Sequence, residues 1–233
     1  LERQRYPKAG DPNPYVKAGV VSVADGKNIW IDFEAKADHY LAFPTWAPDS
    51  KSVVLQWMNR GQDTIRLYAC DPATGAKAQL HEEKQDAWVE FFEDLTFLAD
   101  GRFIVRSNAD GWDHLYLHGP DGKLQRRLTS GAWRVTGIET VDEKGGWVYF
   151  SGRPKRSWDS ELLRVKLDGT GLGTLTPEEG THRVRVSPAG AYFTDSVSTM
   201  TTPAQMTLRR GDGSEVRALG DSRTPAMAEY AWG

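Results

Sequence analysis

The sequence predicts an all-β fold of the β-propeller type, and three observations support this class. Tight turns of the Asp-Gly type recur at intervals of roughly 47 residues. Short strands with alternating apolar side chains precede these turns, and no helical period competes with them. A repeat of this length built from strands and hairpins is typical of propeller blades. The turns are Asp25-Gly26, Asp121-Gly122, Asp168-Gly169 and Asp212-Gly213, with the DPATG segment at residues 71–75 in the remaining place.

Each repeat predicts a four-stranded antiparallel meander. A first strand ends at a turn such as Trp46-Ala47-Pro48-Asp49, and a second strand rich in β-branched and aromatic residues follows. A third strand leads into the Asp-Gly turn, where Gly readily adopts the positive φ of a type I′ hairpin. The second strands are expected at residues 53–57, 103–107, 147–151 and 192–196. The complete blades are expected at about 40–83, 88–130, 135–177 and 181–220, after a half blade at 1–35.

Four complete blades and part of a fifth do not close a ring. An open propeller leaves strand edges and apolar flanks exposed, because its blades are buried against one another. The chain also begins without Met. We therefore expect a piece of a longer protein, with the ring completed by residues outside this chain or by a second copy.

Composition excludes several classes of function. The 233 residues are 39% hydrophobic and 26% charged, which suits a globular protein with a sizeable core. A net charge of -3 gives no general attraction to nucleic acid or to an anionic membrane. The apolar runs have strand length, so no membrane segment is expected. The single cysteine, Cys70, cannot form an internal disulfide and is expected to be buried at a strand end.

No catalytic machinery is visible in the chain. It lacks a G-x-S-x-G nucleophile elbow, and its five histidines show neither H-E-x-x-H nor another paired metal spacing. We therefore expect no catalytic residue, no metal and no cofactor. The acidic pairs Glu93-Asp94 and Glu178-Glu179 are expected in solvated loops without partners.

The chain resembles the propeller of the dipeptidyl peptidase IV family. Four segments in that family's order carry the resemblance, and together they extend along most of the chain. They are YPKAG at 6–10 with Asn13-Pro14, LQWMNR at 55–60, DGWDHLY at 110–116, and LTSGAW at 128–133 with Val135. The resemblance ends near Leu219, where the family's propeller gives way to its hydrolase domain.

This resemblance implies the C-terminal half of an eight-bladed propeller that restricts entry to an α/β-hydrolase domain. The longer protein would be a serine peptidase of the prolyl oligopeptidase class that removes Xaa-Pro or Xaa-Ala dipeptides from free N-termini. Its Ser, Asp and His triad would follow the propeller, so this chain alone would be inactive. Residues 221–233 would form the connector to that hydrolase domain. The implied partners are peptide substrate, the hydrolase domain and a second copy in a homodimer, in an extracytoplasmic or periplasmic location.

The resemblance also implies substrate-binding residues. Trp88-Val89 is similar to the start of a family loop that reaches into the central cavity. An aromatic residue just beyond would contact the extended part of the substrate cleft, and Phe91 or Phe92 fills that place. Glu93 stands where the family has a basic residue. The alternative is that Trp88, Phe91 and Phe92 simply pack between blades.

Other features favour structural roles. Trp30, Trp46, Trp57 and Trp147 are expected to fill the interfaces between blades. The Asp-Gly turns are expected to do little beyond reversing the chain. Two further functions stay open: a binding or scaffolding propeller without a peptidase domain, and a related peptidase with endopeptidase or acylaminoacyl specificity.

Overall fold

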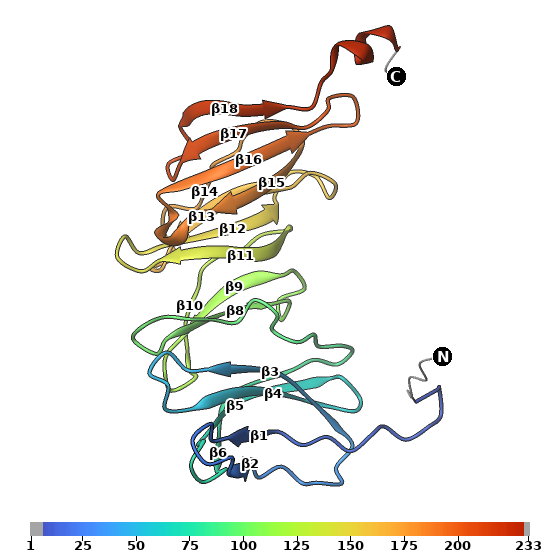
Figure 1. Cartoon of the computed structure of the whole chain (residues 1–233), viewed down its shortest axis with the longest axis vertical. Coiled ribbons are helices and arrows are strands. Elements are labelled where there is room, and N and C mark those ends of the chain that lie inside the picture. The colour runs from blue at the N-terminus through green and yellow to red at the C-terminus, as the bar shows by residue number, and fades with distance from the viewer. Residues whose placement is uncertain (1–6, 231–233) are drawn as a thin grey trace. The chain divides into compact units, whose positions relative to one another are not determined.

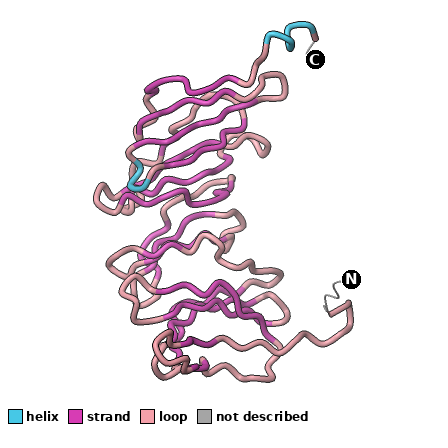
Figure 2. Tube along the Cα trace, in the orientation of Figure 1, coloured by secondary structure: helices cyan, strands magenta, loops and turns pink. Residues whose placement is uncertain are grey.

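The computed structural model describes residues 7–230, and its regular secondary structure is almost entirely β-strand, with loops and turns between the strands (Figures 1 and 2). Tyr6 of the opening motif and residues 231–233 of the expected connector lie outside the described residues. The strands form four four-stranded antiparallel sheets and one two-stranded sheet. No helix in the described part of the chain has the length and apolar character needed to cross a membrane.

Every sheet is a meander, because its strands pair in the order in which the chain makes them. The two-stranded sheet contains β1 (Gly19–Val21) and β2 (Asn28–Trp30). The next sheet contains β3 (His39–Trp46), β4 (Val53–Asn59), β5 (Thr64–Cys70) and β6 (Lys77–Lys84). It is followed by β7 (Thr96–Phe97), β8 (Phe103–Ser107), β9 (His114–His118) and β10 (Leu124–Arg127).

The last two sheets complete the series. One contains β11 (Arg134–Asp142), β12 (Trp147–Arg153), β13 (Glu161–Lys166) and β14 (Gly173–Thr174). The other contains β15 (Thr181–Val186), β16 (Tyr192–Ser198), β17 (Gln205–Arg210) and β18 (Glu215–Asp221). Among the described residues there are two short 3-10 helices: η1 (Pro188–Gly190) lies between β15 and β16, and η2 (Pro225–Glu229) follows β18. The four predicted second strands are confirmed as β4, β8, β12 and β16.

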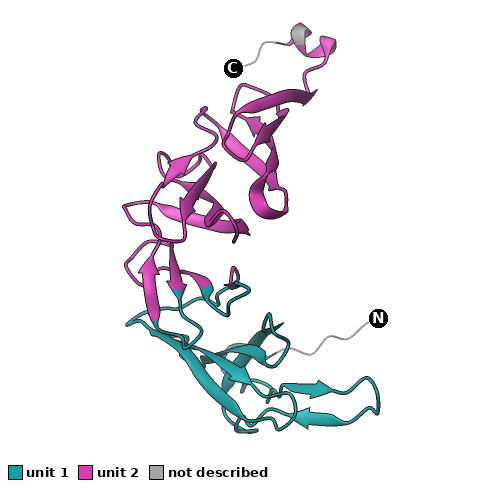
Figure 3. Cartoon of the chain, turned by 90° about the vertical axis from the view of Figure 1, so that its left-hand side faces the viewer, with its two compact units in different colours: residues 1–93, 97–103, 118–123 teal, residues 94–96, 104–117, 124–233 magenta. Residues whose placement is uncertain are grey.

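Contacts divide the chain into two compact units, which Figure 3 shows in different colours. One unit contains residues 1–93, 97–103 and 118–123, and the other contains the remaining residues. Within each unit, apolar clusters bring together side chains from consecutive sheets. In the first, Ile31 packs with Leu55 and Cys70; in the second, Tyr149 packs with Phe193. Burial raises the pKa of the Cys70 thiol to about 11, as expected for a small core residue.

The turns that follow the third strands lie against the preceding sheet. A Cβ added at Gly122 would lie 1.5 Å from the Leu80 carbonyl oxygen at β6. At Gly75 it would lie 2.1 Å from the Trp30 carbonyl oxygen, and at Gly213 2.9 Å from that of Leu175. The expectation that the Asp-Gly and DPATG turns do little beyond reversing the chain is therefore wrong for the turns at Gly75, Gly122 and Gly213. We call each such approach a turn-glycine contact; the turn at Gly169, close to the Arg126 side chain, makes the fourth.

Two of the tryptophans assigned to blade interfaces are exposed instead. Trp30 is 59% exposed and Trp46 is 52% exposed, so the prediction is wrong for both. Each stands at the end of a strand that lies on the edge of its sheet. Trp57 and Trp147 are half-buried, and arginine guanidinium groups cover them at 4.8 Å (Arg66) and 4.3 Å (Arg164) from the ring centroids.

Candidate functional site

The loop between β6 and β7, residues 85–95, contains all four residues expected to contact substrate. It folds back onto the turn between β4 and β5 of its own sheet. The Gln85 amide donates to the Asp63 carbonyl at 2.9 Å, and the Val89 amide donates to the Gln62 carbonyl at 2.8 Å. Because Val89 is also buried, the loop is fixed in its middle as well as at its start.

A buried glutamine fixes the far end of the same loop. Gln56 on β4 donates from Nε2 to the Phe92 carbonyl at 2.9 Å, while the Phe92 amide donates to Gln56 Oε1 at 2.8 Å. The two residues are 1% and 3% exposed. A buried amide group is costly unless both its donor and its acceptor are paired, and the backbone of Phe92 pairs both. We call this pair of bonds the Gln56 clamp.

The clamp separates the four expected site residues into buried and exposed positions. Phe92 lies in the core, with its ring 5.8 Å from that of His81. Trp88 is 53% exposed, and Glu93 is exposed as well. Phe91 is half-buried, and its ring meets that of Phe43 edge-on at a centroid distance of 5.5 Å. The loop thus presents Trp88, Phe91 and Glu93 outward, while Phe92 holds it in place.

Three of the four acidic residues expected in solvated loops without partners do have cationic partners, so that expectation is wrong for Asp94, Glu178 and Glu179. Asp94 accepts a hydrogen bond from Arg106 Nε at 2.5 Å. Glu178 accepts one from Arg209 at 2.7 Å, and Glu179 pairs with Arg156. The partners lie 12 to 31 residues apart in the sequence, and the fold of the chain brings them close.

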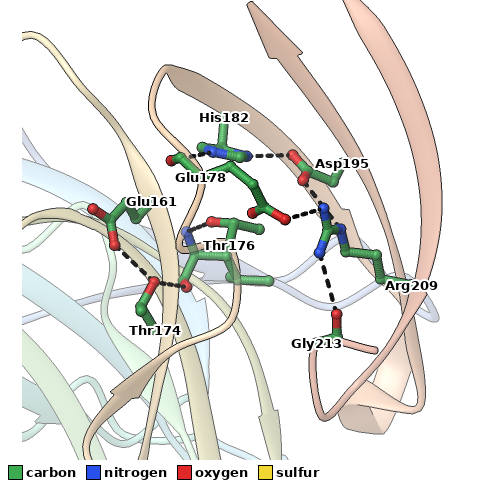
Figure 4. A network of polar contacts seen from close by, with 9 residues as sticks. Glu161, Thr174, Thr176, Glu178, His182, Asp195, Arg209 and Gly213 are labelled. Atoms are coloured by element: carbon green, nitrogen blue, oxygen red, sulfur yellow. Dashed lines mark hydrogen bonds and ion pairs between the residues drawn. The ribbon is translucent and has the colours of Figure 1, made fainter. Parts of the chain in front are cut away.

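A buried charged network lies in the last sheet (Figure 4). His182 donates from Nδ1 to Asp195 Oδ1 at 2.8 Å, and its Nε2 faces the Glu178 carbonyl oxygen at 3.2 Å. Arg209 Nε lies 3.4 Å from the second Asp195 oxygen. Burial would lower the pKa of His182, but the hydrogen bond and charge of Asp195 outweigh it and raise the pKa.

This histidine–aspartate pair has the contacts of a catalytic dyad without access to substrate. The side chains of His182 and Asp195 are fully buried. Because both ring nitrogens face acceptors, neither is available to take a proton from a nucleophile. The network instead links β15, β16 and β17 within the sheet. No three His, Cys, Asp or Glu side chains among residues 7–230 gather in a way that would hold a metal ion.

Comparison with known proteins shows the family of the chain. The model of the dipeptidyl peptidase IV N-terminal region matches residues 1–204. This chain belongs to the dipeptidyl peptidase IV family. The chain is 26% identical to the probable dipeptidyl peptidase 4 of Emericella nidulans over 245 residues, which covers 97% of this chain and 32% of the relative. The probable dipeptidyl-aminopeptidase B of the same organism is 30% identical over 81% of this chain and 23% of its own length.

Solved structures of dipeptidyl peptidase IV relatives show the same fold. Porphyromonas gingivalis dipeptidyl peptidase 4 superposes with a TM-score of 0.88 at 27% identity, covering 97% of this chain and 32% of that one. A putative dipeptidyl aminopeptidase IV from Bacteroides ovatus gives a TM-score of 0.86 at 28% identity, with 95% and 35% covered. The predicted β-propeller class is therefore confirmed. The chain spans about a third of the length of the curated relative that it matches over 97% of its own residues.

Two residues that contact this candidate site were not among those expected from the sequence. Gln56 belongs to the LQWMNR segment that carries the resemblance, yet nothing in that segment indicates a contact with residue 92, 36 positions away. Nothing in the sequence around Phe43 indicates a role in the site, because its ring joins the site only through its contact with Phe91. Both are contacts between residues distant in sequence.

A histidine pair lies beside the site loop, and we expect it to make the propeller sensitive to acid. The rings of His81 on β6 and His118 on β9 meet at 4.5 Å, and His118 donates from Nδ1 to the Gly122 carbonyl at 3.0 Å. Burial, together with repulsion from His118, lowers the pKa of His81 to about 4, against a smaller opposing effect of Glu82.

We expect His81→Gln to remove part of the acid instability of the chain. The pKa of His81 is lower in the folded chain than its value near 6.5 in the unfolded chain, so the unfolded chain takes up a proton first as the pH falls. The free energy of unfolding is therefore highest above pH 6.5 and falls by about 3 kcal/mol in total as the pH drops toward 4. Urea denaturation at intervals from about pH 7 to pH 4 measures the effect. An identical loss in the variant and the wild type would show that other groups carry the acid response.

Proposed function

We propose that this chain is the non-catalytic, substrate-gating part of the propeller of a dipeptidyl peptidase IV-like serine peptidase that releases Xaa-Pro dipeptides from peptide N-termini. The match to the dipeptidyl peptidase IV N-terminal region over residues 1–204 carries the proposal. The names of the relatives support the substrate class, since they are called dipeptidyl peptidases or dipeptidyl-aminopeptidases. A loop held at both ends by the core supports a recognition role.

We also propose how the chain is divided. The blades occupy about 40–83, 88–130, 135–177 and 181–220, after a half blade at 1–35. Residues 221–233 lead toward an α/β-hydrolase domain of the same protein, and η2 lies in this connector. The hydrolase domain, the peptide substrate and a second copy are the proposed partners.

In this proposal the exposed side chains of the β6–β7 loop contact peptide substrate. Trp88 and Phe91 offer apolar ring surface, and Glu93 adds a carboxylate beside them. Phe92 belongs to the same site, where it is the buried residue that holds the loop in place. Aromatic side chains on a fixed loop suit recognition, because little conformational freedom is lost when a ligand binds.

Hydrolysis of Gly-Pro chromogenic substrates by the longer protein tests this function. We expect it to cleave the substrate with a free amino group and to leave an N-terminally blocked one intact, whereas this chain alone cleaves neither. Release of product by the isolated chain would contradict the assignment of the triad to another domain. Cleavage of the blocked substrate would indicate an endopeptidase, and no cleavage of either would favour a binding or scaffolding propeller.

A further inference from the structure

Phe43 adopts a backbone conformation that aromatic residues rarely take. Its φ is +50°, in the left-handed region that favours glycine. The residue that follows is Pro44, whose ring further restricts the backbone of the residue before it. Strained residues of this kind persist where the surrounding structure enforces them, and they cluster at functional sites.

A β-bulge produces this conformation. In the pairing of β3 with β4, Ala42 lies opposite Gln56 and Thr45 lies opposite Val54, so that Phe43 and Pro44 together face the single residue between them. β3 is an edge strand of its sheet. Bulges at sheet edges commonly redirect a side chain, and here the redirected ring is 44% exposed.

The redirected ring meets the proposed substrate loop. Phe43 and Phe91 pack edge-on with ring centroids 5.5 Å apart and planes inclined by 60°. Each ring therefore keeps part of its surface open to solvent. The bulge begins one residue after Ala42, the partner of Gln56, and the Gln56 clamp holds the residue that follows Phe91. The Ala42–Gln56 pair of β3 and β4 thus lies next to the attachment of both rings.

We infer that Phe43 is a specificity-determining residue, which together with Phe91 receives a large apolar side chain of the peptide substrate. Two rings inclined to each other offer an apolar corner, and aliphatic or aromatic side chains are the groups that gain most from covering it. Gln56 acts as a positioning residue, since it holds the loop that carries Phe91. This inference rests on the proposed function.

The test uses the longer protein and peptides with a common N-terminal Xaa-Pro, in which each other position in turn carries Leu or Ala. We expect the wild type to prefer Leu at one position by about 10-fold in kcat/KM. We expect Phe43→Gly to lose most of that preference. It should also melt within a few degrees of the wild type, because Gly takes the positive φ without strain and so offsets the lost ring contact.

Two further variants separate specificity from structure. Ser50→Gly is the matched control, because Ser50 also has a positive φ (+58°), in the turn after β3, but places no ring at the site. It should leave the preference unchanged. Phe91→Ala removes the other ring without touching the bulge and should abolish the preference as Phe43→Gly does.

Several outcomes would overturn the inference. A preference for Leu that survives in both Phe43→Gly and Phe91→Ala would do so, as would a wild type without any such preference. An equal loss of activity on every peptide, with a markedly lower melting temperature in both variants, would show that the rings serve packing only. A longer protein that cleaves no dipeptide substrate would refute the proposed function itself, and the inference with it.

Discussion

Replacing Gly122 with Ala is expected to lower the free energy of unfolding by about 3 kcal/mol or more. Two costs combine at this position. The φ of Gly122 is +79°, which disfavours any residue with a Cβ, and that Cβ would lie 1.5 Å from the Leu80 carbonyl oxygen. Because the obstacle is backbone, no side-chain rotation relieves the clash, and the turn must move away from β6. Urea denaturation of the variant and the wild type measures the loss.

Gly26→Ala is the matched control for this prediction. Gly26 also follows an aspartate in a tight turn and has a φ of +71°, but a Cβ added there meets no atom within 4 Å. Only the backbone strain applies, so the expected loss is about 1 kcal/mol. Equal losses in the two variants would show that the turn at Gly122 does not need its close approach to β6.

Asp195→Ala is expected to destabilise the chain by about 3 to 5 kcal/mol. Asp195 is the only carboxylate that the structure places against both His182 and the Nε atom of Arg209, among the residues described. Its removal leaves two buried cationic groups without that partner. Glu178 still pairs with Arg209 from the other side, but its side chain is about half exposed, which weakens its compensation.

The loss in Asp195→Ala should depend on pH. The pKa of His182 is raised in the folded protein, so its ion pair with Asp195 contributes fully below the unfolded pKa near 6.5. This contribution disappears as the pH rises through the folded pKa. The difference between wild type and variant should therefore be larger at about pH 6 than at about pH 9. Glu179→Ala, which breaks an exposed pair with Arg156, should cost far less than Asp195→Ala.

Much of the fold was predictable because its signals are local. The Asp-Gly turns and the β-branched second strands each lie within a few neighbouring residues, and the meander follows from them. The exposure of Trp30 and Trp46 was not predictable in this way. An aromatic residue in a strand pattern shows a pleated position but does not show whether another strand covers it.

The site was only partly predictable, since its decisive contacts join distant residues. The sequence placed an aromatic pair after Trp88 but did not show which ring would be buried. The Gln56 clamp, formed across 36 residues, decides that Phe92 points inward. In the same way, Asp195 and Glu178 acquire their roles only when β16 and β17 bring Arg209 beside them.

The turn-glycine contacts also bear on how such a chain tolerates sequence change. At Gly75, Gly122 and Gly213 the approach is to a backbone carbonyl, so the fit is indifferent to the side chain of the residue that supplies the oxygen. These residues are Trp30, Leu80 and Leu175, which differ in size and chemistry. The approach of the glycine therefore sets no requirement on these side chains, although Leu175 is held separately by its place in the apolar core. The requirement falls on the glycines, because any larger residue there would force two sheets apart.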